Sequence, residues 1–165
     1  MKKELLIRTF QLDDCQGLVP LYDQLGYPVD VATLAHRLPT MLTKEDYHLL
    51  VATMNDQIIG FIGFVQMKMF EADEDYIRIL ALVVDEGARR QGIGQGLLER
   101  VKDFAKLRGI RNLAVNSGIT SEREAAHAFY ENEGFIKVSF GFKCQIWRSQ
   151  NDYGIMRTCF QELSI

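Results

Sequence analysis

A glycine-rich stretch near the middle of the chain has the composition of a phosphate-binding loop. It reads ARRQGIGQGLL, residues 88–98, and lies between an apolar run and a segment with apolar residues at helical spacing. Glycine has no Cβ, so Gly92 and Gly94 would let a ligand approach the backbone closely. The first turn of the following helix would present unpaired N–H groups at the positive end of its dipole, which suits a phosphate or pyrophosphate. The plainer alternative is a tight turn whose arginines, Arg89 and Arg90, are solvated.

Two familiar nucleotide-binding motifs do not fit this loop. The chain contains no Gly-Lys-Ser or Gly-Lys-Thr, so a P-loop nucleotide hydrolase is excluded. Leu97 stands where the last glycine of a dinucleotide-binding GxGxxG would be, and the loop comes late in the chain. A dinucleotide-binding fold is therefore disfavoured.

Two blocks of sequence resemble the GNAT acetyltransferase superfamily. The stretch from Arg89 to Gly94 fits the pattern [RQ]-x-x-G-x-[GA] of that family and follows a strand-like LALVVD. The segment AAHAFYENEGF, residues 125–135, is similar to the family's last conserved block and stands at the expected distance. The resemblance covers the chain to about Ile146, with Glu86 standing where the family often has proline. It implies an acetyl-CoA-dependent enzyme.

The resemblance also implies a fold and a way of binding the cosubstrate. The fold would be an α/β, three-layer α/β/α domain whose mixed sheet is splayed between the fourth and fifth strands by a bulge in the fourth. The pantetheine arm of acetyl-CoA would fill that gap, and its pyrophosphate would lie on backbone N–H groups of the glycine-rich loop. One backbone N–H near Val84 would face the thioester oxygen. The implied cofactor-binding residues are Leu82, Val83, Val84, Arg89, Arg90, Gln91, Gly92, Ile93, Gly94, Gln95, Asn116, Phe129 and Tyr130.

Tyr130 is the catalytic residue that the resemblance implies. In the family the corresponding tyrosine lies near the CoA sulfur, where it can protonate the leaving thiolate. A packed surface aromatic is the alternative. Asn116 would hydrogen-bond the pantetheine or simply end a strand, and Phe129 would line the channel or belong to the core. His127 on the same helix could carry a proton, but we expect it to have a packing or surface role.

The acceptor side is less well defined. Arg78 aligns near a glutamate that serves as the base in many relatives, so no base can be assigned. We expect the acidic run 71–75, with Glu71, Asp73, Glu74 and Asp75, to attract a cationic acceptor, the alternative being a solvated loop. The segment 25–42 corresponds to the family's variable acceptor-binding region. The residues Tyr22, Tyr27, His36 and Arg37 lie in or beside it and identify no substrate.

Composition limits the class of protein. The chain has 165 residues, 47% of them hydrophobic, a formal net charge of -3 and a pI near 5.6. We expect one domain over residues 1–165, and neither nucleic acid nor a membrane as a partner. The odd number of cysteines without a CxxC pair argues against a disulfide framework or a zinc site. No metal and a cytoplasmic location are therefore expected.

Hydrophobic periodicity and turn residues predict the elements that hold these residues in place. Asn55-Asp56 predicts a hairpin, Asp30 caps a helix, Gly109 ends another, and Ser121 with Glu124 fits a capping box. Residues 147–165 form either a C-terminal extension or the true final strand, which could pair across a homodimer. Strands are expected at 5–10, 47–54, 58–67, 76–84, 113–116, 135–138 and 140–146, and helices at 14–25, 31–43, 94–108 and 121–134.

The sequence thus supports two function hypotheses. The first is an N-acetyltransferase that moves an acetyl group from acetyl-CoA to a primary amine of a small molecule or peptide, by direct attack in a ternary complex. The second is a catalytically silent acyl-CoA-binding sensor or scaffold module. Tyr130 beside an intact glycine-rich loop favours the enzyme. Neither hypothesis names the acceptor or excludes another short acyl group.

Overall fold

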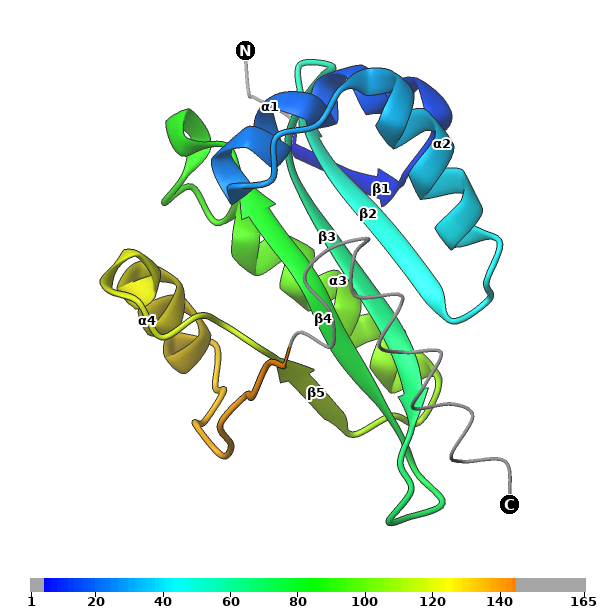
Figure 1. Ribbon diagram of the computed structural model, residues 1–165, viewed down its shortest axis with the longest axis vertical. Helices are drawn as coiled ribbons and strands as arrows, with labels where there is room; N and C mark the ends of the chain where they lie inside the picture. Colours follow the sequence, from blue (N-terminus) through cyan, green and yellow to red (C-terminus); the bar gives the residue numbers. More distant parts are fainter. Residues whose placement is uncertain (1–4, 145–165) are drawn as a thin grey trace, which may run out of the picture. The chain divides into compact units, whose positions relative to one another are not determined.

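The computed structural model describes residues 5–144, and its central feature is a five-stranded mixed sheet (Figure 1). The strands are β1 (Leu5–Thr9), β2 (Tyr47–Met54), β3 (Gln57–Lys68), β4 (Asp75–Val84) and β5 (Asn112–Val115). They follow one another across the sheet in chain order; β1 to β4 are antiparallel, and β5 runs parallel to β4. The parallel pair is joined by a helix, as a parallel connection requires.

Helices cover both faces of the sheet, which confirms the predicted three-layer α/β/α class. The helices are α1 (Cys15–Leu25), α2 (Val31–Leu42), α3 (Ile93–Leu107) and α4 (Glu124–Asn132), with short 3-10 turns η1 (Leu12–Asp14), η2 (Glu86–Ala88) and η3 (Ser121–Arg123). In Figure 1, α1 and α2 lie on the near face, α3 crosses the far face, and α4 stands beside the end of β5.

Most predicted boundaries are confirmed, because short-range chemistry fixes them. Asn55 and Asp56 both adopt left-handed backbone angles in the β2–β3 hairpin, as a tight turn requires. The Asp30 carboxylate accepts the backbone N–H of Thr33 and so begins α2. Gly109, with a φ of 68°, ends α3.

The capping-box prediction was wrong. Ser121 begins the 3-10 turn η3, and the backbone N–H of Glu124 donates to the carbonyl of Ser121 instead of to its hydroxyl. That N–H is therefore already satisfied. α4 consequently begins at Glu124, without a side-chain cap.

The two closing strands were also wrong as far as the structure describes them. Residues 135–144 form no strand, and residues 145–146 lie outside the described part. The alternating apolar side chains Ile136, Val138, Phe140 and Phe142 are exposed. Alternation indicates which side chains would share a face, but a strand also needs a neighbouring strand along its length, and residues 135–144 do not belong to the five-stranded sheet.

The chain divides into two compact units, Met1–Gly134 and Phe135–Ile165. The first unit contains the whole sheet and every helix of the described residues. The expectation of a single domain over residues 1–165 remains a prediction. The question of whether residues 147–165 form a final strand lies outside the described residues.

The core of the first unit depends on one close approach between a strand and α3. A Cβ added at Gly60 would lie 2.9 Å from the backbone oxygen of Val83 and 3.4 Å from the side chain of Leu97. Ile93, Leu97 and Leu98 of α3 are almost completely buried over this part of the sheet. Glycine at position 60 thus lets α3 lie close to β3 and β4.

Replacing Asp14 with asparagine should destabilise the fold. The carboxylate of Asp14 is buried and accepts both terminal nitrogens of Arg8, at 2.7 and 2.8 Å, and the backbone N–H of Gln11 at 2.7 Å. The change leaves the guanidinium with a neutral partner, so we expect a loss of about 2 kcal/mol in the free energy of unfolding. Urea unfolding of Asp14→Asn measures it, with exposed Asp13→Asn as the control.

The same ion pair predicts a dependence on pH. Burial, the largest influence, raises the pKa of Asp14, but the hydrogen bonds from Arg8 and Gln11 more than offset it and leave the pKa lowered. A carboxylate whose pKa is lowered in the folded state stabilises the fold at pH values above its ordinary pKa of about 3.9. This stabilisation is lost as the pH falls through the folded-state pKa. The difference in unfolding free energy between parent and variant should therefore shrink below about pH 4. A constant difference down to acid-induced unfolding would contradict the assignment.

Candidate active site

The sheet opens between β4 and β5, as predicted. These strands pair only from Tyr76 with Asn112 to Ile79 with Val115, although β4 continues to Val84. The register between β3 and β4 shifts at the same level, because Gly63 faces Ala81 and Phe64 faces Ile79. Leu80 is therefore the extra residue of a bulge, and a bulge bends its strand away from its neighbour.

The bulge leaves one edge of β4 available to a ligand. Backbone groups of successive residues point to alternate sides of an antiparallel strand. Asp85 donates its N–H to the carbonyl of Ile59 in β3 at 2.8 Å. Val84 and Leu82 must therefore direct their N–H and C=O groups toward the side from which β5 has diverged. The carbonyl of Val84 already accepts the Nε–H of Arg89, at 3.1 Å.

A cavity of about 300 Å³ occupies this opening. It brings together three of the predicted site residues, Leu82, Asn116 and Tyr130, from β4, the end of β5 and α4. Its lining also includes residues that the sequence reasoning did not select for the site. They include Leu80, Ser117, Arg123 and Ala126. Arg123 directly precedes α4 and could have been noticed as the cation nearest the last conserved block.

The glycine-rich loop joins the end of β4 to the first turn of α3. Arg90 and Gly92 have φ angles of 62° and 80°, and Gly92 caps the helix without a side-chain hydrogen bond. Gly96 donates its N–H to the carbonyl of Gly92 at 2.8 Å, so the preceding N–H groups have no partner within the helix. Left-handed residues next to a helix N-terminus form a concave set of donors that suits an anion.

Two predicted binding residues, Val83 and Ile93, offer only their backbone to a ligand. The side chains of Val83 and Ile93 are buried in the core, 6% and 1% exposed. Gln91 and Gln95 are exposed on the loop and on the first turn of α3. A role for Val83 and Ile93 therefore depends on their main-chain groups, whereas Gln91 and Gln95 also expose their side chains.

Phe129 connects the loop to α4. A Cβ added at Gly94 would lie 3.4 Å from the Phe129 ring and 3.6 Å from the side chain of Val84. The ring also meets Tyr130 edge to face, with 5.4 Å between centroids. Phe129 thus forms a wall where the glycine-rich loop, the end of β4 and α4 meet.

Tyr130 has the protonation state that an acid requires. Burial raises the pKa of its phenol above the ordinary value of about 10, and the nearby charge of Arg123 offsets part of that increase. The phenol is therefore protonated at neutral pH and can donate a proton. By contrast, Nε2 of His127 lies 2.8 Å from the carbonyl of Gly118, to which it must donate. His127 ties the loop after β5 to α4, in agreement with the expected packing role.

A glutamine that the sequence reasoning missed holds the start of the loop. Gln24 on α1 donates to the carboxylate of Asp85 at 2.9 Å and accepts the backbone N–H of Glu86 at 2.9 Å. The other oxygen of Asp85 accepts the N–H of Gly87. These contacts join the end of α1 to the turn that leads into the glycine-rich loop. The two partners lie 61 residues apart in sequence, which explains why no local pattern indicated the contact.

The acidic run does not line the cavity of the β4–β5 opening. Glu74 pairs with Arg111, while Asp75 accepts Gln66 and Lys68. The run begins β4 at the other end from Leu82, roughly 20 Å away along the strand. Attraction of a cationic acceptor by these carboxylates remains a prediction, and two of the four already have partners.

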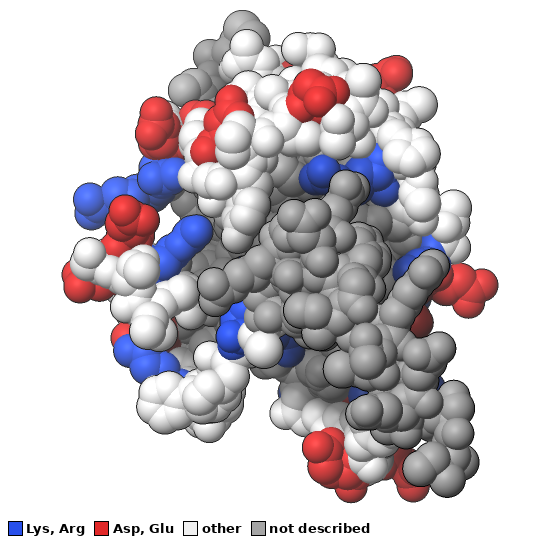
Figure 2. Space-filling view, in the orientation of Figure 1, with Lys and Arg blue, Asp and Glu red and all other residues white. Residues whose placement is uncertain are grey.

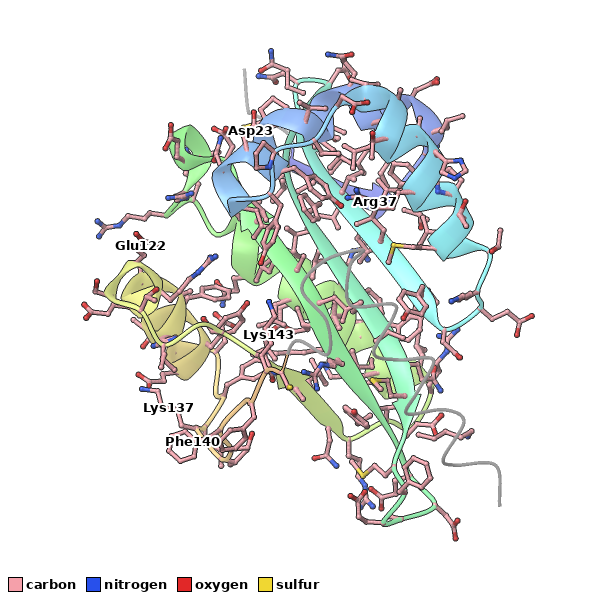
Figure 3. The ribbon with its side chains drawn as sticks, in the orientation of Figure 1. Asp23, Arg37, Glu122, Lys137, Phe140 and Lys143 are labelled. Carbon is pink, nitrogen blue, oxygen red and sulfur yellow. The ribbon has the colours of Figure 1, made fainter. Side chains whose placement is uncertain are left out.

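Of the residues suggested for the acceptor side, only Tyr27 lines the cavity. Tyr22 stacks on Phe61 with 5.3 Å between ring centroids. Figure 3 labels Arg37 on α2 and Asp23 near the end of α1. The same figure labels Glu122, which precedes α4. The face in Figure 2 carries interspersed acidic and basic side chains without a field of one sign.

Residues 5–144 lack two features, a membrane-spanning helix and a cluster of metal ligands. No helix there is long and apolar enough to cross a bilayer. No three His, Cys, Asp or Glu side chains within the same range lie close enough together to hold a metal ion.

Comparison with known proteins identifies the family. The family model described as "Acetyltransferase (GNAT) family" matches residues 11–135. The N-acetyltransferase YhdJ of Bacillus subtilis is 29% identical over 75% of this chain and 86% of its own length. N-acetylaspartate synthetase of Danio rerio is 32% identical over 53% of this chain, which spans 29% of that relative.

A solved structure agrees with the sequence comparison. A GNAT family acetyltransferase from Staphylococcus aureus superposes with a TM-score of 0.74 and 31% identity, covering 86% of this chain and 98% of that one. The family match therefore covers most of the sequence. It includes most of the mixed sheet, the bulge at Leu80 and the glycine-rich loop before α3. The chain belongs to the GNAT family of acetyltransferases.

Proposed function

We propose that the protein transfers an acetyl group from acetyl-CoA to a primary amine, by direct attack within a ternary complex. GNAT enzymes generally use acetyl-CoA. The observation that carries the proposal is the cavity in the β4–β5 opening, because it places Asn116 and Tyr130 against the unpaired edge of β4. The pantetheine arm would take the place of a strand beside Leu82 and Val84, and its pyrophosphate would reach the first turn of α3.

The residues present supply the chemistry of this transfer. A backbone N–H on the open edge of β4 would stabilise the negative oxygen that develops when the amine attacks the thioester. Tyr130 would protonate the thiolate as it leaves, and water would take up the proton that the attacking amine loses. Asn116 would hold the pantetheine, and Phe129 would keep the arm against the loop.

The first experiment separates an enzyme from a silent binding module. Acetyl-CoA is incubated with the protein and single amines, and release of the free CoA thiol is followed with a thiol-reactive dye. The panel should contain aspartate, chosen because one relative is named N-acetylaspartate synthetase. A polyamine, an amino sugar, lysine and a peptide N-terminus cover other charges. Tight acetyl-CoA binding without release for any amine would favour the alternative, a sensor or scaffold module.

The order of chemical events can be tested once an acceptor is found. Direct attack requires both substrates to be bound, so double-reciprocal plots at several acceptor concentrations should intersect. Parallel lines, or an acetylated protein seen by mass spectrometry without acceptor, would contradict direct attack. Propionyl-CoA in the same assay tests whether the site accepts a longer acyl group.

Replacing Gln24 with leucine should weaken acetyl-CoA binding without changing the chemistry. The variant removes both contacts to the Asp85–Glu86 turn, so the loop loses a fixed starting point. We expect the KM for acetyl-CoA to rise about fivefold, with kcat nearly unchanged. Gln24→Glu keeps an acceptor for the N–H of Glu86 but faces Asp85 with a second charge, and should behave no better. An unchanged KM would show that the contacts do not position the loop.

A further inference from the structure

A second cavity, of about 840 Å³, lies at the opposite edge of the sheet from the β4–β5 opening. The end of β1, the start of β2, the loop after α2 and the C-terminal half of α3 form its walls. It shares no lining residue with the cavity of the β4–β5 opening. Its volume is within the range of small-molecule sites in proteins. Nothing in the proposed acetyl transfer uses it.

The floor of this second cavity is aromatic. His48 stacks on Phe64, with 5.0 Å between centroids and 27° between planes, and meets Phe104 at 4.5 Å. Phe64 and Phe104 are in edge-to-face contact at 5.1 Å. Tyr47 and Phe10 also line the cavity. Such a cluster offers ring faces and edges against which a flat aromatic molecule packs well.

The polar part of His48 is not used within the fold. Its ring nitrogens make no hydrogen bond to any residue in the described range 5–144. Burial, and to a smaller degree Arg108, lowers its pKa, so the ring is neutral at neutral pH. A neutral imidazole has one donor and one acceptor, and the cavity is where a ligand could use them.

Three of the four Lys and Arg side chains in the lining lack anionic partners among the described residues, and the fourth, Arg8, pairs with Asp14. Arg100, Arg108 and Lys44 form no ion pair among residues 5–144, whereas the carboxylate of Asp103 pairs with Lys106 at 3.4 Å. The guanidinium of Arg108 lies over the Phe104 ring, 3.7 Å from its centroid, and Arg100 makes one long contact to the carbonyl of Ile7 at 3.4 Å. Both guanidinium groups therefore keep most of their donors.

Helix geometry places the charges around the aromatic floor. Arg100 and Arg108 come one helical turn before and one after Phe104, about 6 Å along the axis in each direction. A ring packed on Phe104 would therefore have a guanidinium beside either end. Glu45 is a carboxylate of the lining that does not pair within the described range, so positive charge predominates.

We propose that this second cavity binds a small, flat aromatic anion, with its ring against His48 and Phe104, which pack on the buried Phe64, and its carboxylate on Arg108 or Arg100. A guanidinium presents parallel N–H donors that match the two oxygens of a carboxylate. The cavity is separate from the β4–β5 opening, so this ligand and acetyl-CoA bind at the same time. The inference does not depend on the proposed acetyl transfer.

Calorimetric titration with naphthoate tests the proposal, using the full chain at low salt and with acetyl-CoA present in excess. We expect saturable binding of one molecule, about tenfold tighter than that of uncharged naphthylmethanol. Arg108→Gln should reduce the affinity about fivefold and Arg100→Gln by a similar factor. Lys102→Gln is the matched control and should bind as the parent does, because Lys102 lies on the same helix while it and its partners Glu99 and Glu133 are outside the lining.

Each contrary result overturns the proposal in a different way. Equal affinity for naphthoate and naphthylmethanol would show that the carboxylate contributes nothing to binding. Displacement of naphthoate by acetyl-CoA would place it in the β4–β5 opening instead. Unchanged affinity in both arginine variants would show that the cations only stabilise the C-terminal end of α3. Thermal melting of each variant verifies that it is folded, and failure to saturate would exclude a site altogether.

Discussion

Replacing Gly92 with glutamate is expected to abolish acetyl-CoA binding while the fold persists. The new carboxylate would stand at the N-terminus of α3, where the proposed pyrophosphate lies, and two negative groups a few ångströms apart repel each other by several kcal/mol. We therefore expect the dissociation constant to rise by at least about 10²-fold. Titration calorimetry with acetyl-CoA measures it directly.

Gly92→Ala is the control that separates charge from backbone strain. Gly92 has a φ of 80°, so any side chain costs about 1 kcal/mol there, but no heavy atom lies within 4 Å of an added Cβ. The alanine variant should lose a similar amount of stability and bind acetyl-CoA much more tightly than the glutamate variant. Equal affinity of parent and Gly92→Glu would show that the phosphate groups lie elsewhere.

Replacing Tyr130 with phenylalanine should lower turnover by about 10²-fold with little effect on acetyl-CoA affinity. The change removes one hydroxyl and keeps the ring that packs against Phe129. If the hydroxyl protonates the leaving thiolate, its loss affects only the transition state. Single-turnover rates with a saturating amine measure the chemical step without product release.

The pH dependence provides a second test of Tyr130. Because burial raises the pKa of the phenol above about 10, the group stays protonated throughout the neutral range. The ratio of parent to variant turnover should therefore be constant between about pH 6 and pH 9. A ratio that changes in that interval, or a variant as fast as the parent, would contradict the role of this tyrosine as an acid.

Patterns that act over a few residues predicted much of this protein. Period-two and helical spacing placed five strands and four helices, and turn chemistry at Asn55, Asp56 and Gly109 fixed boundaries. The glycine-rich loop could be identified from the sequence, because a backbone that a ligand can approach closely requires glycine residues, and these are visible in the sequence itself. Local rules failed at Ser121, where a carbonyl took the place of the expected hydroxyl.

Tertiary structure decided what depends on residues far apart in the chain. The bulge at Leu80 is defined by how β4 pairs with β3. The hydrogen bonds of Gln24 join α1 to the turn after β4. The aromatic floor of the second cavity combines β2, β3 and α3. The predicted strands at 135–138 and 140–146 had the right alternation, yet their described residues form no strand. Sequence periodicity specifies the face of an element, whereas its neighbours are set by long-range packing and backbone pairing that no local pattern contains.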